Sequence, residues 1–358
     1  MAAGHSNPRN SYKIKNMKIK ITYLTLALLA LLTGCDKHPV PNPGPDASSR
    51  SYIFFSQSID TKASLVTTSN MGSAGLVGYM YDGTWESTAN TAATDRGYVF
   101  YDNNVSVPNE TMTVSADGTC SYEPLQVWRG QKTYSFFAYY PLGNNSVVLN
   151  TAGNAPTITY TMDATSAENL KSTMVDVVTA ACKDVDQSDV GNKGDLELEF
   201  NHRLSCLAVQ VKNTSSGTIT LNSIILNIAG IKNNSITIPL DGSTPTPSGP
   251  PTAISVNLLP LTPTITEKVV VANTTKELSD KLLFIPQSDN ITITGEVNYT
   301  REASGYTDNT STITLPAKTT PLAEGKKQLL QLNFTESTVT ATIAPTTWVA
   351  VDVYNTFN

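Results

Sequence analysis

Residues 133–140 read Thr-Tyr-Ser-Phe-Phe-Ala-Tyr-Tyr, and Pro141 follows directly. Aromatic residues favour strands, and a proline cannot donate to the hydrogen-bond ladder of a central strand. The segment therefore predicts a buried strand that ends at Tyr140. A second interpretation is a platform that stacks on sugars. Its rings would be Tyr134, Phe136, Phe137, Tyr139 and Tyr140.

Short strand signals of the same kind continue on both sides of this segment. Towards the N-terminus they cover 51–59, 76–81 and 97–101. Towards the C-terminus they cover 157–162, 176–181, 196–200, 204–211, 219–228, 235–239, 254–259, 268–271, 281–285, 290–299, 311–315, 327–334, 339–343 and 348–357. One modest helix is expected at 167–172. Regular short strands with polar turns predict an all-β fold.

The length of the chain suggests two tandem β-sandwich domains. The turn at 190–194 is rich in glycine, asparagine, lysine and aspartate, and it is the best place to divide them. We therefore expect an N-terminal sandwich over 51–193 and a C-terminal sandwich over 194–358. A second proline-rich break at 244–251 is expected to be a surface loop.

The N-terminal end carries an export signal. Lys18 and Lys20 precede the apolar run 21–32, and Leu32-Thr33-Gly34-Cys35 closes it. The run is too short to span a bilayer, so 1–34 are expected to be a signal peptide, with Met17 as its natural start. The last four residues resemble the bacterial lipobox, which predicts acylation of Cys35, such as palmitoylation. The alternative is an ordinary signal peptide with an incidental cysteine.

Residues 35–50 are expected to form a proline-rich tether that holds the folded part away from the membrane. The formal net charge is -6 and no basic block is present, which argues against a nucleic-acid partner. Three cysteines remain after Cys35, so they cannot all pair. We favour buried free thiols over one disulfide for these three, Cys120, Cys182 and Cys206.

The sequence offers little for catalysis. His202 is the one histidine beyond the tether, and it lies between two strand signals, where a structural role is favoured. No zinc-ligand spacing, nucleophile elbow or phosphate loop is found in the sequence. We expect that the protein is not an enzyme and binds no cofactor. A hydrolase whose site is invisible in the sequence stays as a rival hypothesis.

Three motifs, taken together, resemble the fimbrillin-like proteins, which are lipoprotein pilus subunits of Gram-negative gut and oral anaerobes. The first is the stretch 127–141, which runs from Trp128 to Ala-Tyr-Tyr-Pro. The second is Asp176-Val177-Val178 followed by 196–204, with Phe200-Asn201-His202-Arg203-Leu204 opening the second domain. The third is 324–327 before 330–334 and Trp348.

This resemblance implies two sandwich domains of transthyretin-like topology and export as a lipidated precursor to the outer membrane and cell surface. It also implies that a trypsin-like protease removes the first strand. A strand of the next subunit, a copy or a paralogue, then fills the open groove and extends a fimbria that supports adhesion. A host or bacterial surface receptor is a further expected partner. The alternative function is a surface lipoprotein that binds glycan through an aromatic patch.

Candidate processing and donor residues follow from this resemblance. Cleavage after Arg50 would remove only the tether, whereas cleavage after Lys62 would also remove the first strand, 51–59. The chain could therefore polymerise after a cut at Lys62 or remain an uncut anchor, and the sequence leaves both open. At the C-terminus, alternation places four apolar residues on one face of a candidate donor strand, 348–358: Val349, Val351, Val353 and Phe357. The alternative is that this strand completes its own sandwich.

Overall fold

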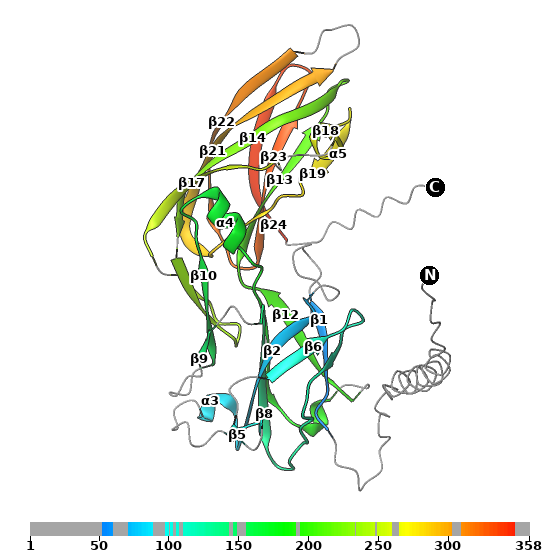
Figure 1. Ribbon diagram of the computed structural model, residues 1–358, viewed down its shortest axis with the longest axis vertical. Helices are drawn as coiled ribbons and strands as arrows, with labels where there is room; N and C mark the ends of the chain where they lie inside the picture. Colours follow the sequence, from blue (N-terminus) through cyan, green and yellow to red (C-terminus); the bar gives the residue numbers. More distant parts are fainter. Residues whose placement is uncertain are drawn as a thin grey trace, which may run out of the picture. The chain divides into compact units, whose positions relative to one another are not determined.

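Strands make up most of the chain that the structure describes (Figure 1). The computed structural model describes residues 52–59, 71–88, 97–99, 101–102, 105–106, 110–142, 146–148, 155–190, 194–232, 234–247, 249–259, 265–302 and 309–347. All of them belong to the compact unit that begins at Tyr52. The helices within these ranges are short: α3 (Trp85–Thr88), α4 (Ala167–Thr173), α5 (Ile265–Lys268) and the 3-10 helix η2 (Gln187–Asp189). The expected all-β fold class is confirmed.

The first sheet closes on itself. Its strands lie in the order β3-β2-β6-β7-β1-β12-β11-β8, and an additional pairing joins β8 to β2. The strands are β1 (Phe55–Ile59), β2 (Ser73–Tyr81), β3 (Gly97–Tyr98), β6 (Glu110–Val114), β7 (Thr119–Ser121), β8 (Thr133–Tyr140), β11 (Val178–Val185) and β12 (Leu196–His202). A small ladder of β4 (Tyr101–Asp102) with β5 (Val105–Ser106) forms separately.

The aromatic strand β8 is buried on both faces, as the sequence predicts. Tyr134 and Phe136 belong to the hydrophobic core enclosed by the closed sheet. Phe137 and Tyr139 point the other way, into the larger core cluster that continues into the rest of the chain. Successive side chains of a strand alternate between faces, so a strand between two cores carries a continuous apolar run.

Three further sheets follow. A small sheet has the order β16-β15-β10-β9, with β9 (Ser146–Val148), β10 (Thr157–Met162), β15 (Asn234–Pro239) and β16 (Thr246–Pro247). The next sheet has the order β19-β13-β23-β24, with β20 beside β13; it comprises β13 (Ser205–Asn213), β19 (Thr274–Glu277), β20 (Leu282–Phe284), β23 (Lys326–Phe334) and β24 (Val339–Thr347). The last has the order β17-β14-β21-β22, with β18 beside β14; it comprises β14 (Thr218–Lys232), β17 (Pro251–Asn257), β18 (Val269–Val270), β21 (Gln287–Glu302) and β22 (Asn309–Leu322).

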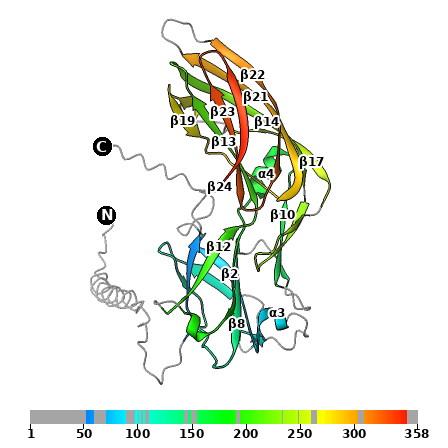
Figure 2. The same cartoon turned by 180° about the vertical axis from the view of Figure 1, so that it is seen from behind.

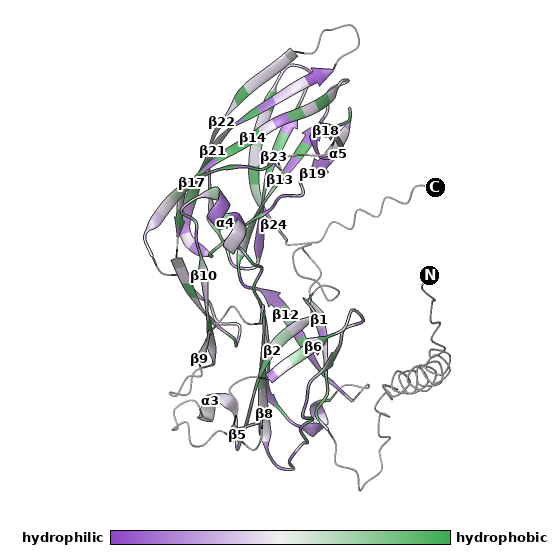
Figure 3. Cartoon of the chain, in the orientation of Figure 1, coloured by the Kyte–Doolittle hydropathy of each residue, from purple (hydrophilic) through white to green (hydrophobic). Residues whose placement is uncertain are grey.

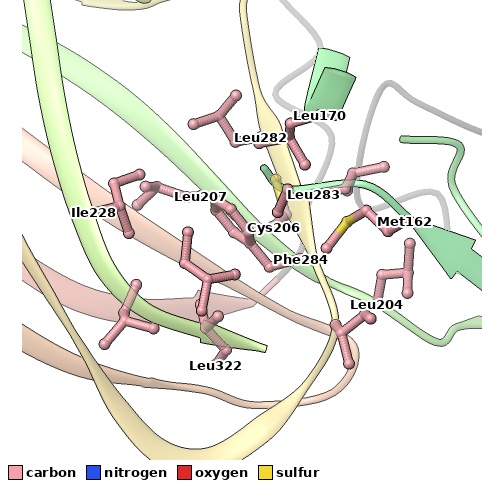
Figure 4. Close-up of a cluster of buried hydrophobic side chains, with 14 of the residues drawn as sticks. Met162, Leu170, Leu204, Cys206, Leu207, Ile228, Leu282, Leu283, Phe284 and Leu322 are labelled. Carbon is pink, nitrogen blue, oxygen red and sulfur yellow. The ribbon is translucent and has the colours of Figure 1, made fainter. Parts of the chain in front are cut away.

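The sheets of β13 and β14 pack face to face as a sandwich (Figures 1 and 2). Tyr299 on β21 meets Phe334 on β23 edge to face, with ring centroids 5.0 Å apart. Along the long strands, apolar residues alternate with polar ones (Figure 3), so each sheet turns one apolar face inward. Figure 4 shows the part of this core where β13 and β20 meet Met162 of β10 and Leu170 of α4.

Strand pairing also links the two halves of the chain. β12 lies beyond the expected boundary at 193, yet it pairs with β1 and β11 of the closed sheet. Conversely, β10 pairs with β15 along its full length, from Thr157 opposite Pro239 to Met162 opposite Asn234. The division into domains at 193 stays a prediction.

Candidate functional site

The first strand, β1, is hydrogen-bonded on both sides. It runs parallel to β12, with Phe55 opposite Leu196, and antiparallel to β7, with Phe55 opposite Cys120. The Gln57 N–H donates to the Gly118 carbonyl at 2.8 Å on the β7 side. Strand β1 is therefore an interior strand of the closed sheet, and its removal would leave two rows of unpaired backbone groups.

Side chains at alternate positions of this segment point into the core. Ile53 and Phe55 are fully buried. The Phe55 ring centroid lies 4.9 Å from that of Phe136 and 5.8 Å from that of Tyr122. The Tyr122 hydroxyl also donates to the Ile53 carbonyl at 2.9 Å. Residues 53–55 are therefore packed into the core, against an aromatic floor formed by Phe136 and Tyr122, and do not lie on the surface.

Gln57 is the third inward residue, and it places a polar amide where Ile53 and Phe55 have apolar side chains. Its side chain is 6 % exposed, and neither Oε1 nor Nε2 has a hydrogen-bond partner among the described residues. The neighbour in register on β12 is Leu198, which is fully buried. On the other side lies Gly118, whose φ of +87° suits glycine. A Cβ at Gly118 would lie 2.9 Å from the Gln57 carbonyl oxygen, so only glycine permits this close approach.

Sequence reasoning located β1 but missed its partner β7. The strand was expected at 51–59, and the structure gives Phe55–Ile59 with an isolated bridge between Tyr52 and Val127. The hairpin of β6 and β7 has strands of five and three residues. The signal that could have revealed it is Asp117-Gly118, a turn dipeptide between Val114 and Cys120.

The other candidate site residues lie outside the described residues. These are Cys35, Arg50, Lys62, Val349, Val351, Val353 and Phe357. Their roles in lipidation, processing and strand donation stay predictions.

His202 is held in a buried pair. Its Nδ1 lies 2.9 Å from Oδ2 of Asp176, and the two side chains are 5 % and 2 % exposed. The next residue, Arg203, places Nε 2.9 Å from Oε1 of Glu324, and burial raises the pKa of that carboxyl although the Arg203 charge opposes the shift. The Arg203 guanidinium also donates to the Ser243 carbonyl. These pairs join distant segments, which supports a structural role for His202.

The aromatic segment provides no exposed sugar platform. Tyr134, Phe136, Phe137 and Tyr139 are buried, and Tyr140 is half-buried. A hollow of about 480 Å³ lies beside the start of β8, lined by Trp128, Arg129, Lys132 and Asp186 among others. Asp186 caps the 3-10 helix η2, and hydrogen bonds from Ser188 lower the pKa of its carboxyl. The acid in this hollow therefore already has a structural use.

The cysteines and the described helices add no further site. Cys120, Cys182 and Cys206 are free thiols, and Cys120 and Cys206 are buried. Within the described ranges, no group of three or more histidine, cysteine, aspartate or glutamate side chains could hold a metal ion. None of the helices in those ranges has the length and hydropathy to cross a membrane.

Residues 61–347 match the family model described as fimbrillin-like. The chain belongs to the fimbrillin-like family. It is similar to the fimbrium subunit Fim1C of Phocaeicola vulgatus, with 26% identity over 221 residues that cover 57% of this chain and 54% of the relative. The chain thus spans about half the length of that curated relative.

The fold of this fimbrillin-like chain is also similar to a crystal structure of a fimbrial protein from Bacteroides vulgatus. The two share 18% identity and a TM-score of 0.56, over 84% of this chain and 100% of the other. At this identity the likeness establishes the fold. Together with the family match, it places the chain among fimbrial proteins of sandwich-like β architecture.

Proposed function

We propose that this fimbrillin-like chain is a structural subunit, stalk or anchor, of a cell-surface fimbria that supports adhesion. In this proposal subunits assemble by strand exchange, with copies or paralogues as partners. The observation that carries it is the position of β1, an interior strand that fills a core pocket near the N-terminal end of the chain. Such a strand can be removed by one cut, and the gap it leaves fits another strand.

The two candidate cuts would have different results. A cut after Arg50 leaves Ile53 and Phe55 in place, because both follow it in the chain. A cut after Lys62 frees the whole of β1 and exposes the edges of β7 and β12. A donor strand from the next subunit would restore both ladders and cover the aromatic floor of Phe136 and Tyr122. Because donor and groove are different surfaces, the contact repeats without closing and gives a filament.

The anchoring part of the proposal rests on Cys35 and the proline-rich tether at 35–50. Acylation at Cys35 would hold the precursor on the outer membrane, and a chain left uncut at Lys62 would stay there as an anchor. Metabolic labelling with a fatty-acid analogue tests this step, because Cys35→Ala should abolish the label. Label that persists on the variant would contradict a lipid anchor.

Replacing the two candidate processing residues tests strand removal. Cells producing Lys62→Ala should carry precursor with β1 retained and no polymer of this chain. Arg50→Ala is the matched control, because it also removes a trypsin-type site but leaves assembly unchanged. Electron microscopy and the mature N-terminus, read by mass spectrometry, are the measurements. Fimbriae whose subunits begin at Cys35 or Ser51 would show that β1 is kept and that strand replacement is wrong.

The alternative function, glycan binding through an aromatic patch, gains no support from β8, because four of its aromatic rings are buried. An adhesive receptor would have to be recognised by another surface of the assembled fimbria.

A further inference from the structure

The three inward side chains of residues 53–57 do not fit the hydrophobic core equally well. Ile53 and Phe55 are apolar and lie in apolar surroundings. Gln57 carries an amide into the same core, with Leu198 on one side and Gly118 on the other. A buried amide that gives up its bonds to water without replacing them typically disfavours the folded arrangement about tenfold or more.

A second buried glutamine shows what a satisfied amide looks like in the same chain. Gln287 is also 6 % exposed. Its Oε1 accepts from the Lys232 N–H at 2.8 Å, and its Nε2 donates to the carbonyls of Gly230 at 2.8 Å and Asp289 at 3.1 Å. Burial of a glutamine is thus compatible with full hydrogen bonding here, and Gln57 differs in lacking it.

We propose that Gln57 is the weak point of the first strand: its pocket is better filled by an apolar side chain of an incoming strand, so that replacement of β1 is favoured at this position. The inference rests on the proposed strand exchange and names a residue that regulates it. Before the cut, the covalent chain keeps β1 at an effectively high local concentration, so the poor fit is tolerated. After the cut, the connection to the rest of the chain is lost and the unsatisfied amide favours departure.

In the proposed strand exchange, the incoming strand is the candidate donor at 348–358 of a second copy of this chain. Val349, Val351 and Val353 follow one another at the same two-residue spacing as Ile53, Phe55 and Gln57. Because β1 is parallel to β12 and antiparallel to β7, a strand inserted in either direction makes one ladder of each kind. With Val351 at the Phe55 position, the Gln57 pocket receives Val353 in one direction and Val349 in the other. Either way a valine without polar atoms replaces the amide.

The test uses the full chain with residues 60–66 replaced by the recognition sequence of a sequence-specific protease, so that β1 can be cut free at will. Gln57→Met removes the amide and keeps the length of the side chain. We expect the uncut variant to melt about 3 °C higher. After the cut, its first-strand peptide should dissociate about tenfold more slowly, and uptake of a synthetic peptide of residues 348–358 should slow by a similar factor. Fluorescence anisotropy of labelled peptides measures both rates.

Gln287→Met is the matched control, because it removes three hydrogen bonds at equal burial and should lower the melting temperature. Equal or faster dissociation from the Gln57→Met variant, or a lower melting temperature, would overturn the inference even if donor uptake is normal. Slower dissociation together with no donor uptake by either protein would support the weak point and contradict strand exchange as the proposed function. The two failures are therefore distinguishable.

Discussion

The first and the last strands that the structure describes are held in opposite ways. β1 is short, yet it is paired on both sides and its segment places Ile53 and Phe55 in the core. β24 spans Val339–Thr347 and pairs with β23 along that whole length, but it lies at the end of its sheet. The contribution of a strand to stability therefore depends on its neighbours and its inward side chains more than on its length. We therefore expect loss of β1 to destabilise its sheet much more than loss of the residues that follow β24.

Removal of β1 is expected to have its largest effect on the reactivity of Cys120. This residue lies on β7, opposite Phe55 of β1. Burial raises the pKa of its thiol to about 12, so at pH 8 it is almost wholly protonated and unreactive. Loss of β1 should return this pKa towards its ordinary value of about 8.5 and speed alkylation by iodoacetamide on the order of a thousandfold. Mass spectrometry measures the labelling in a chain that is cleaved within residues 60–66, directly after β1. Cys35→Ser is included so that this thiol does not react.

Cys206 is the internal control for that measurement. Burial raises the pKa of the Cys206 thiol to about 12 as well. Cys206 lies on β13, which belongs to a different sheet from β1. It should stay protected after the cut. Equal labelling of Cys206 would mean that the whole chain unfolds, and unchanged protection of Cys120 would mean that β1 does not leave.

A smaller effect is expected from truncating one side chain in each strand. Phe55→Ala empties the pocket between Phe136 and Tyr122 and should lower the free energy of unfolding by about 3–5 kcal/mol. Ile343→Ala, at a half-buried position of β24, should lower it by about 1 kcal/mol. Urea titration followed by tryptophan fluorescence gives both values. Similar losses at the two positions would remove the contrast between an interior and an edge strand.

The smallest effect on stability is expected from the C-terminal tail. Deleting residues 348–358 leaves every pairing between β23 and β24 in place, so the free energy of unfolding should change by less than about 0.5 kcal/mol. Polymerisation should nevertheless fail, because the candidate donor Val349, Val351, Val353 and Phe357 is removed. A chain that unfolds on this deletion would show that the tail completes its own sandwich, and fimbriae that still form would require another donor.

The sequence by itself determined the fold class and several strand limits. β8 begins at Thr133 and ends at Tyr140, as expected, because Pro141 cannot extend the ladder. β10 at Thr157–Met162 also agrees, and α4 at Ala167–Thr173 agrees within one residue. These limits are local features: they depend on side-chain periodicity and turn residues that lie close together in the chain. Family membership could be inferred from the three motifs together with their order and spacing.

Tertiary structure alone decided how the candidate groove is built. Pairing of β1 with β12 joins Phe55 to Leu196, and no local pattern specifies a partner so distant in the sequence. The hairpin of β6 and β7 escaped prediction because its strands have only five and three residues, which is too few for a clear periodic pattern. Alternation from Ile53 and Phe55 does place Gln57 on the inner face, but its missing hydrogen bonds appear only once Leu198 and Gly118 are in position beside it. Satisfaction of a buried polar group is a property of all its neighbours in space, and these are brought together only by the folded chain.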